Sequence, residues 1–162
     1  MRTLLVLRHA KSSWDDPGLS DHDRPLNKRG RRDAPRMGEL MDELDILPDI
    51  IFSSTAVRAR TTAVLFADAC GYGGEILLDD ELYHAAPAEY LRTLSESAGG
   101  ADCAMVVGHN PGIQELVAVL TGAHERMPTA AMACIELGID DWREIGSATG
   151  TLAGAWRPKQ LG

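Results

Sequence analysis

Aromatic residues are scarce in this chain of 162 residues, at 5%, so aliphatic side chains must supply most of the packing. No apolar run approaches the roughly 20 residues that cross a membrane, and the amino terminus lacks the apolar stretch and cleavage site of a signal peptide. The three cysteines, Cys70, Cys103 and Cys134, form no CxxC pair, which indicates reduced thiols. These absences favour a cytoplasmic protein that contacts no membrane.

Positive charge is also in short supply, with 16 basic against 24 acidic residues and a net charge of −8. This balance argues against a nucleic-acid-binding protein that relies on its overall charge. Neither a GxxxxGK[ST] loop nor a GxGxxG motif after a strand is present. The acidic pairs Asp15-Asp16 and Asp79-Asp80 could hold Mg²⁺, but adjacent acids on loops are usually solvated. We therefore expect no metal and no other cofactor.

Short apolar runs alternate with longer helix-like segments. Strands are expected at 3–7, 50–52, 76–78, 103–107, 131–137 and 151–156, and helices at 28–44, 56–69, 88–97 and 112–120. Asn27, the hydroxyls of 53–55 and Asn110 are expected to cap the first, second and fourth helices. This order predicts a single domain over 1–162, an α/β fold with a three-layer α/β/α sandwich around a mainly parallel central sheet.

Basic side chains follow three of these strands. Arg8 and His9 end the first, Arg58 follows the second by one helical turn, and His109 follows the fourth. Parallel strands end at one edge of the sheet, where ligands bind, so we expect the four side chains to converge there. Guanidinium groups and a helix amino terminus hold phosphoryl oxygens, and a neutral imidazole is a competent nucleophile. The pattern predicts metal-independent phosphoryl transfer through a phosphorylated histidine.

Other reactive side chains receive structural interpretations. Cys103 and Cys134 lie inside expected strands as small core residues, and Asp21-His22-Asp23 is expected on an exposed loop. Several arginines are expected at the surface of helices, namely Arg31, Arg32, Arg36 and Arg60.

Three motifs in this order resemble the histidine phosphatase superfamily, which has the phosphoglycerate-mutase-like fold. They are Leu7-Arg8-His9-Ala10, then Ser53-Ser54 with Arg58-Ala59 and Thr62-Ala63, and then Gly108-His109-Asn110-Pro111. The opening Arg-His-Ala-Lys-Ser-Ser-Trp and the segment Arg24-Pro25-Leu26…Gly30 are similar to those of SixA-like phosphohistidine phosphatases. The resemblance covers essentially the whole chain.

The resemblance implies that His9 is the phosphorylated nucleophile, that Arg8 and Arg58 bind the phosphoryl oxygens, and that His109 donates a hydrogen bond to them. Ala10 replaces the glycine of the familiar Arg-His-Gly triplet, a common variation in this branch.

Further residues have less specific roles. Ser12 matches a small polar position that lines the pocket in many members, and Lys11 lies beside it or points to solvent. Asn110 is either a substrate contact or a helix cap. Glu81 is either the general acid or simply an exposed loop residue, and the two interpretations are equally supported. The long insert that carries and covers this acid in mutases is missing from the chain. An imidazole leaving group needs such an acid less than an alkoxide does.

The leading hypothesis is therefore a phosphatase that acts on phosphohistidine in a partner protein. A small-molecule phosphomonoesterase on the same scaffold is the alternative, with a small phosphate ester as its substrate. A catalytically silent phosphate-binding module is the alternative of another class, and mutase activity is a distant third. The sequence leaves the oligomeric state open.

Overall fold

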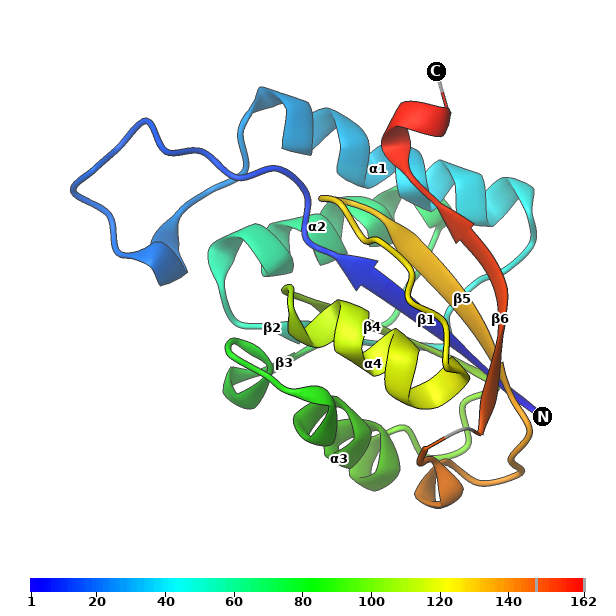
Figure 1. The fold of residues 1–162 in the computed structure, drawn as a ribbon. Coiled ribbons are helices and arrows are strands. Elements are labelled where there is room, and N and C mark those ends of the chain that lie inside the picture. The colour runs from blue at the N-terminus through cyan, green and yellow to red at the C-terminus, as the bar shows by residue number, and fades with distance from the viewer. Residues whose placement is uncertain (148, 162) are drawn as a thin grey trace.

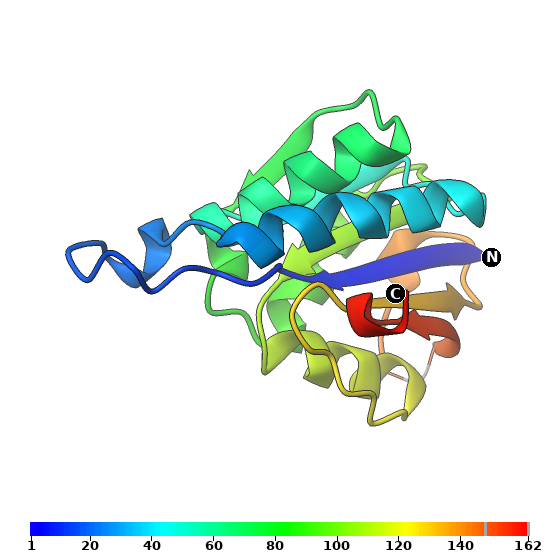
Figure 2. The same ribbon diagram turned by 90° about the horizontal axis from the view of Figure 1, so that it is seen from above.

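The computed structural model describes residues 1–147 and 149–161, which form a sheet covered by helices on both faces (Figures 1 and 2). The strands are β1 (Arg2–Arg8), β2 (Ile50–Ser54), β3 (Ile76–Asp79), β4 (Cys103–Gly108), β5 (Met132–Leu137) and β6 (Gly150–Trp156). The α-helices are α1 (Lys28–Glu43), α2 (Val57–Cys70), α3 (Pro87–Ser97) and α4 (Gly112–Thr121). Short 3-10 turns are η1 (Asp21–Asp23), η2 (Asp80–Leu82), η3 (Trp142–Glu144) and η4 (Pro158–Gln160). Within the described ranges, no helix is both long enough and apolar enough to cross a membrane.

The strand order β3-β2-β4-β1-β5-β6 confirms the expected α/β fold with a mainly parallel sheet. Strands β1, β2, β3 and β4 pair in parallel, whereas β5 and β6 are antiparallel additions at one side. The register pairs Arg8 with Gly108 and Ser53 with Val107. The carboxyl ends of β1, β4 and β2 therefore lie next to one another at one edge.

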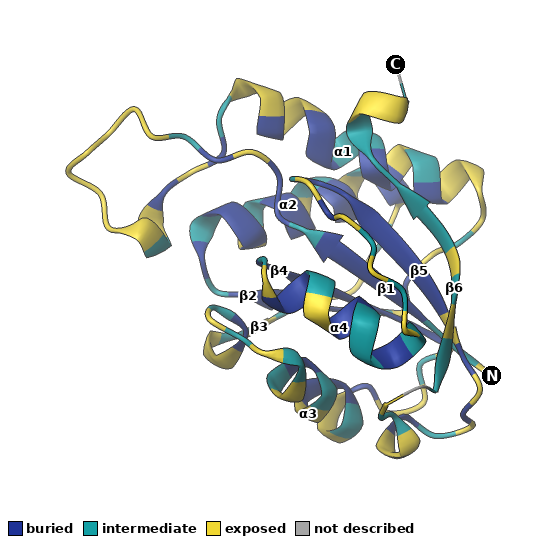
Figure 3. Ribbon diagram, viewed as in Figure 1, coloured by how far each residue is buried: buried dark blue, intermediate teal, exposed yellow. Residues whose placement is uncertain are grey.

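Two apolar layers hold the helices to the sheet. Leu5 and Leu7 of β1 pack with α1 and α2, whereas Leu4 and Val6 pack with α3 and α4 on the opposite face. All four leucine and valine side chains are fully buried, as the dark strands of Figure 3 show. Burial on both faces explains why β1 is a continuous apolar run and not an alternating one.

The start of α1 is fixed against the segment that follows β1. The side chain of Asn27 accepts the backbone N–H of Gly30 at 2.8 Å, which confirms the predicted cap. A Cβ atom on Gly30 would collide with the carbonyl oxygen of Lys11, so only glycine permits this close approach. The start of the helix is thereby anchored against Lys11, two residues after His9.

Two predicted helix caps are wrong. The cap of α2 is Ala56, and Ser54 instead accepts the Ala56 N–H at 3.2 Å from outside the helix. Pro111 caps α4, because the side-chain amide of Asn110 is turned toward Gln114 and Met127. Ser54 Oγ also lies 2.8 Å from His109 Nε2, and Asn110 donates to the Met127 carbonyl at 2.9 Å. Contacts distant in sequence therefore engage both side chains that local preference assigned to the helix ends.

Candidate active site

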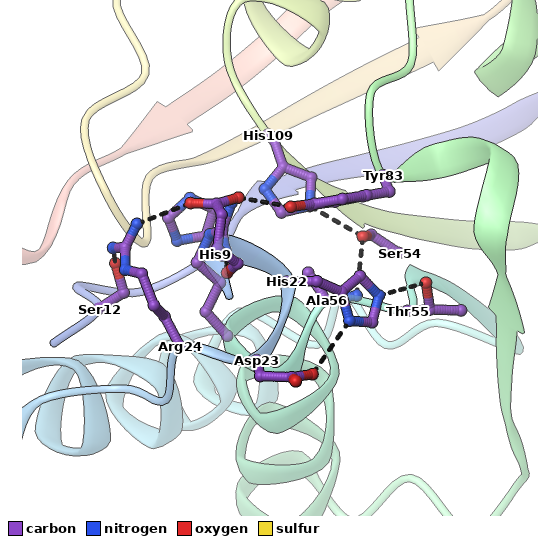
Figure 4. Close-up of polar contacts among 12 residues, drawn as sticks. His9, Ser12, His22, Asp23, Arg24, Ser54, Thr55, Ala56, Tyr83 and His109 are labelled. Carbon is purple, nitrogen blue, oxygen red and sulfur yellow. Dashed lines mark hydrogen bonds and ion pairs between the residues drawn. The ribbon is translucent and has the colours of Figure 1, made fainter. Parts of the chain in front are cut away.

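The adjacent ends of β1, β2 and β4 bring together Arg8, His9, Arg58 and His109. The rings of His9 and His109 lie with centroids 5.0 Å apart, and the backbone N–H of His9 donates to Gly108 at 3.0 Å. His9, Arg58 and His109 are each at most 8% exposed. His9, Arg58 and His109 thus form a buried cluster, in which Figure 4 shows the two histidines side by side. Arg8 is partly buried and close enough for its charge to act on His9.

The imidazole of His9 is held in one tautomer. Its Nδ1 lies 2.7 Å from the carbonyl oxygen of Ala10, and because a carbonyl only accepts, Nδ1 carries the proton. The N–H of Ala10 in turn donates to Thr62 Oγ1 at 2.9 Å, which fixes the segment. Burial, together with the nearby cations Arg58 and Arg8, lowers the pKa of His9 to about 4. At neutral pH, His9 therefore presents an unprotonated Nε2.

The second histidine is oriented by a hydroxyl group. His109 Nε2 lies 2.8 Å from Ser54 Oγ, and the Ser54 hydroxyl, which accepts the Ala56 N–H, can donate its own proton to this nitrogen. In that arrangement His109 Nδ1 carries a proton, and this buried atom has no hydrogen-bond partner among the described residues. Burial and the neighbouring His9 and Arg58 lower the pKa of His109 to about 3. A neutral donor is thus available inside the cluster.

Arg8 adds a guanidinium group with unused bonding capacity. Its Nη1 donates to the carbonyl oxygen of Met127 at 3.2 Å, while its buried Nε has no partner among the described residues. Burial and the like charge of Arg58 lower the pKa of Arg8. Unsatisfied buried donors are costly, and an anion can accept from them.

A carboxylate from η1 engages Arg58. Arg58 donates through Nη1 to the carbonyl oxygen of Asp21 at 2.7 Å and through Nη2 to Asp21 Oδ2 at 3.0 Å. The same carboxylate accepts from the hydroxyl of Tyr83 and from Arg24 Nη1. The hydrogen bond from Tyr83 and the Arg58 guanidinium hold the pKa of Asp21 well below its usual range. Asp21 is therefore ionised at physiological pH.

Arg24 is a third guanidinium group at this site. It is buried, donates to Ser12 Oγ through Nη2, and lies 3.4 Å from the ring centroid of Trp14. Figure 4 shows Arg24 and Tyr83 on either side of His9. Asp21, Arg24 and Tyr83 were not predicted from the sequence as site residues. The Arg24-Pro25-Leu26 motif was the available signal for Arg24, whereas the interpretation of Asp21 as a mere loop residue overlooked its bonds.

The other predicted site residues are placed less centrally. Ser12 is buried beside Arg24, while the side chain of Lys11 is exposed. Asn110 donates to the Met127 carbonyl at 2.9 Å, the same oxygen that Arg8 contacts. Glu81, in η2, is exposed and forms an ion pair with Arg92.

In the acidic pair Asp79-Asp80, the carboxylate of Asp79 accepts two hydrogen bonds from neighbouring groups. Asp79 accepts the Glu81 N–H at 2.9 Å and the Thr93 hydroxyl at 2.9 Å. Among residues 1–147 and 149–161, no group of three or more His, Cys, Asp or Glu side chains is arranged to hold a metal ion.

Comparison with known proteins gives this geometry a family. The sequence pattern of the histidine phosphatase superfamily (branch 1) matches residues 4–86. A chloroplastic protein of Arabidopsis thaliana is 34% identical over 169 aligned residues, which span 99% of this chain and 77% of that protein.

Two solved structures share the fold over nearly their whole length. SixA of Agrobacterium tumefaciens superposes with a TM-score of 0.82 at 29% identity, covering 97% of this chain and 98% of the other. The protein histidine phosphatase SixA complexed with tungstate superposes with a TM-score of 0.85 at 21% identity, covering 99% of both chains. The chain belongs to the histidine phosphatase superfamily and is a phosphatase of its SixA-like branch.

Proposed function

We propose that this phosphatase hydrolyses phosphohistidine in a partner protein through a phospho-His9 intermediate. The observation that carries the proposal is the buried, neutral imidazole of His9, whose Nδ1 proton is engaged by Ala10 and whose Nε2 lone pair is free for attack. Arg8 and Arg58 would bind the phosphoryl oxygens, and His109 would donate a hydrogen bond to them.

The reaction would proceed in two displacements at phosphorus, first by His9 and then by water. In the first, Nε2 of His9 bonds to phosphorus while the P–N bond of protonated phosphohistidine breaks, and the partner's neutral imidazole leaves with the electron pair. In the second, water attacks phosphorus, the bond to His9 breaks, and its electrons return to Nε2. Dihydrogen phosphate leaves with both protons of the water, so His9 is regenerated neutral. Ser12 and Arg24 would line the pocket beside the phosphoryl group.

The acids around the site favour an imidazole as leaving group. Asp21 bonds to Arg58 and Tyr83 and stays ionised, so it has no proton to donate. The carboxylate of Glu81 is paired with Arg92. An alkyl phosphate would leave as an alkoxide and require a proton donor, whereas protonated phosphohistidine carries its own proton. The likeness to SixA of Agrobacterium tumefaciens, which carries the name phosphohistidine phosphatase, supports phosphohistidine as the substrate class.

Turnover of a histidine-phosphorylated protein, compared with a panel of sugar, nucleotide and aryl phosphates in the presence of a metal chelator, tests the proposal. We expect kcat/KM to be at least about tenfold higher for phosphohistidine, and His9→Ala to abolish turnover of every substrate. The matched control is His124→Ala, since His124 is exposed in the loop after α4. Efficient turnover of monoesters alone would contradict the proposal. An unchanged rate in His9→Ala would refute the mechanism. No turnover of any substrate by the unaltered protein would favour the silent phosphate-binding module.

A small-molecule phosphomonoesterase is the alternative. Glu81 and Tyr83 share a hollow of about 420 Å³, and the rings of Tyr83 and His109 meet edge-on with centroids 5.6 Å apart, so an acid could act from this side. Glu81→Gln should then cripple monoester hydrolysis, whereas our proposal expects little change in phosphohistidine turnover.

The three cysteines are free thiols, which supports a reducing compartment such as the cytoplasm as the proposed location.

A further inference from the structure

A groove with basic walls runs between α1 and the carboxyl-terminal segment. Two adjoining hollows of about 480 Å³ and 470 Å³ share Arg29, Pro158 and Lys159 as lining residues. Six basic side chains line the two hollows, namely Arg29, Arg32, Arg36, Arg126, Arg157 and Lys159. More than a third of the 16 basic residues of a chain with net charge −8 are therefore gathered at one groove.

Few carboxylates compensate this charge. Asp33 accepts from Arg29 at 3.4 Å, and Glu125 pairs with Arg157 at 2.6 Å. Arg126 and Lys159 are exposed and form no ion pair among the described residues. Local positive charge in excess over carboxylates creates a field that attracts anions, even on a protein that is acidic overall.

The cations are spread along a line and do not converge on one point. Arg29, Arg32 and Arg36 are spaced three and four residues apart, so they share one face of α1. Seven residues of helix extend over about 10 Å, the length of about three residues of extended chain. Such a row fits an extended segment with several carboxylates better than a single phosphate group. The lining residues include no aromatic side chain on which nucleic acid bases could stack.

One short loop joins this groove to the catalytic cluster. Arg126 and Pro128 line the groove, whereas the carbonyl oxygen of Met127 between them accepts from Arg8 and Asn110. Further along, the N–H of Ala130 donates to the carbonyl oxygen of His9 at 3.0 Å. The loop 126–130 thus contacts the groove through Arg126 and Pro128 and the phosphoryl pocket through the carbonyl oxygen of Met127.

We propose that this basic groove, lined by Arg29, Arg32, Arg36, Arg126, Arg157 and Lys159, binds an acidic segment of the phosphorylated partner protein. The inference rests on the proposed function, because the docked segment belongs to the protein whose phosphohistidine reaches His9. Ala130 lies four positions after Arg126, so the loop between them spans at most about 14 Å. The carboxylates of an extended partner chain would therefore lie roughly four to six residues from its phosphohistidine.

Defined peptides and a charge-matched pair of variants test the groove. The groove variant is Arg29→Gln/Arg126→Gln/Lys159→Gln, and the control variant removes three exposed charges outside the groove, Lys28→Gln/Arg60→Gln/Arg143→Gln. The peptides carry phosphohistidine with three glutamates four to six residues away on either side, or glutamines in their place. Hydrolysis of p-nitrophenyl phosphate and the unfolding temperature report whether each variant retains its fold and its basal activity.

We expect the unaltered protein to turn over the acidic peptides with a kcat/KM about tenfold above the glutamine peptides at low salt, and this preference to shrink at 0.5 M NaCl. The groove variant should lose the preference, whereas the control variant should keep it. Hydrolysis of p-nitrophenyl phosphate should be unchanged in both. Equal rates on acidic and glutamine peptides, or a preference that survives in the groove variant, would overturn the proposal.

Binding of the unphosphorylated acidic peptide, measured by fluorescence anisotropy, separates this inference from the proposed function. If the groove variant loses this binding while phosphohistidine is not hydrolysed by any variant, the proposed function fails and the groove stands. If phosphohistidine is hydrolysed without regard to flanking charge, the groove proposal fails alone. Tighter binding of a single-stranded oligonucleotide of equal charge, through the same three residues, would also overturn it.

Discussion

His9 and His109 are neutral in a cluster that already contains three guanidinium groups. Protonation of either ring would add a cation to a buried, positively charged environment, and this is why both pKa values are lowered. The same property that keeps Nε2 of His9 nucleophilic should make the fold sensitive to acid.

The sign of that sensitivity follows from the pKa of His9. The unfolded chain takes up a proton near pH 6.5, whereas folded His9 does so only near pH 4, so stability is present above pH 6.5 and is lost as the pH falls toward 4. Between pH 7 and pH 5, His9 alone should cost about 2 kcal/mol of unfolding free energy. Urea unfolding at both pH values should show that His9→Asn removes this part of the loss and that His124→Asn does not. If His9→Asn still lost the same unfolding free energy between pH 7 and pH 5, the loss could not be attributed to His9.

The segment between β1 and α1 supplies a carboxylate that occupies the guanidinium groups of the site. Its turn η1 places the Asp21 carboxylate on Arg58, Arg24 and Tyr83. A phosphoryl group that binds Arg58 must therefore compete with an anion supplied by the chain itself.

Removal of that internal anion should strengthen the binding of an external one. In Asp21→Asn, Arg58 and Arg24 keep a weaker, uncharged partner, so we expect the inhibition constant of inorganic phosphate to fall about threefold or more. Asp23→Asn is the matched control, because Asp23 lies in the same turn and its carboxylate pairs only with His22 among the described residues. Competitive inhibition by phosphate measures both. Weaker binding in Asp21→Asn would show that Asp21 chiefly positions the guanidinium groups.

At the level of elements, the sequence predicts the position of side chains that directly follow parallel strands. Arg8, His9, Arg58 and His109 could be placed together because each follows a strand, and parallel strands end at one edge. The bonds of Asp21 could not be predicted, since they link it to residues 37 and 62 positions away through a loop without periodic pattern. The antiparallel direction of β5 and β6 was likewise not predicted, because strand direction depends on how the chain returns to the sheet.

The whole molecule contributes through the distribution of its charge and the coupling of its strands. Its net charge of −8 opposes the approach of anions, so recognition of phosphate depends on the local cluster at the sheet edge. That cluster draws on β1, β4 and the first turn of α2, which are packed into one sheet-centred fold. An anion that bridges these elements must stabilise the folded chain as a unit, because it binds the folded form only.

Thermal unfolding with tungstate, a tetrahedral oxyanion, should therefore report the integrity of the site. At a ligand concentration of 100 Kd, binding contributes about 2.7 kcal/mol, which for a chain of this size raises Tm by about 5 to 10 °C. His9→Ala should keep much of the shift, since Arg8 and Arg58 still hold the oxyanion, whereas Arg58→Ala should lose most of it. Arg60→Ala, an exposed residue on the same helix, is the control and should behave as the unaltered protein. A full shift in Arg58→Ala would show that Arg58 does not hold the oxyanion.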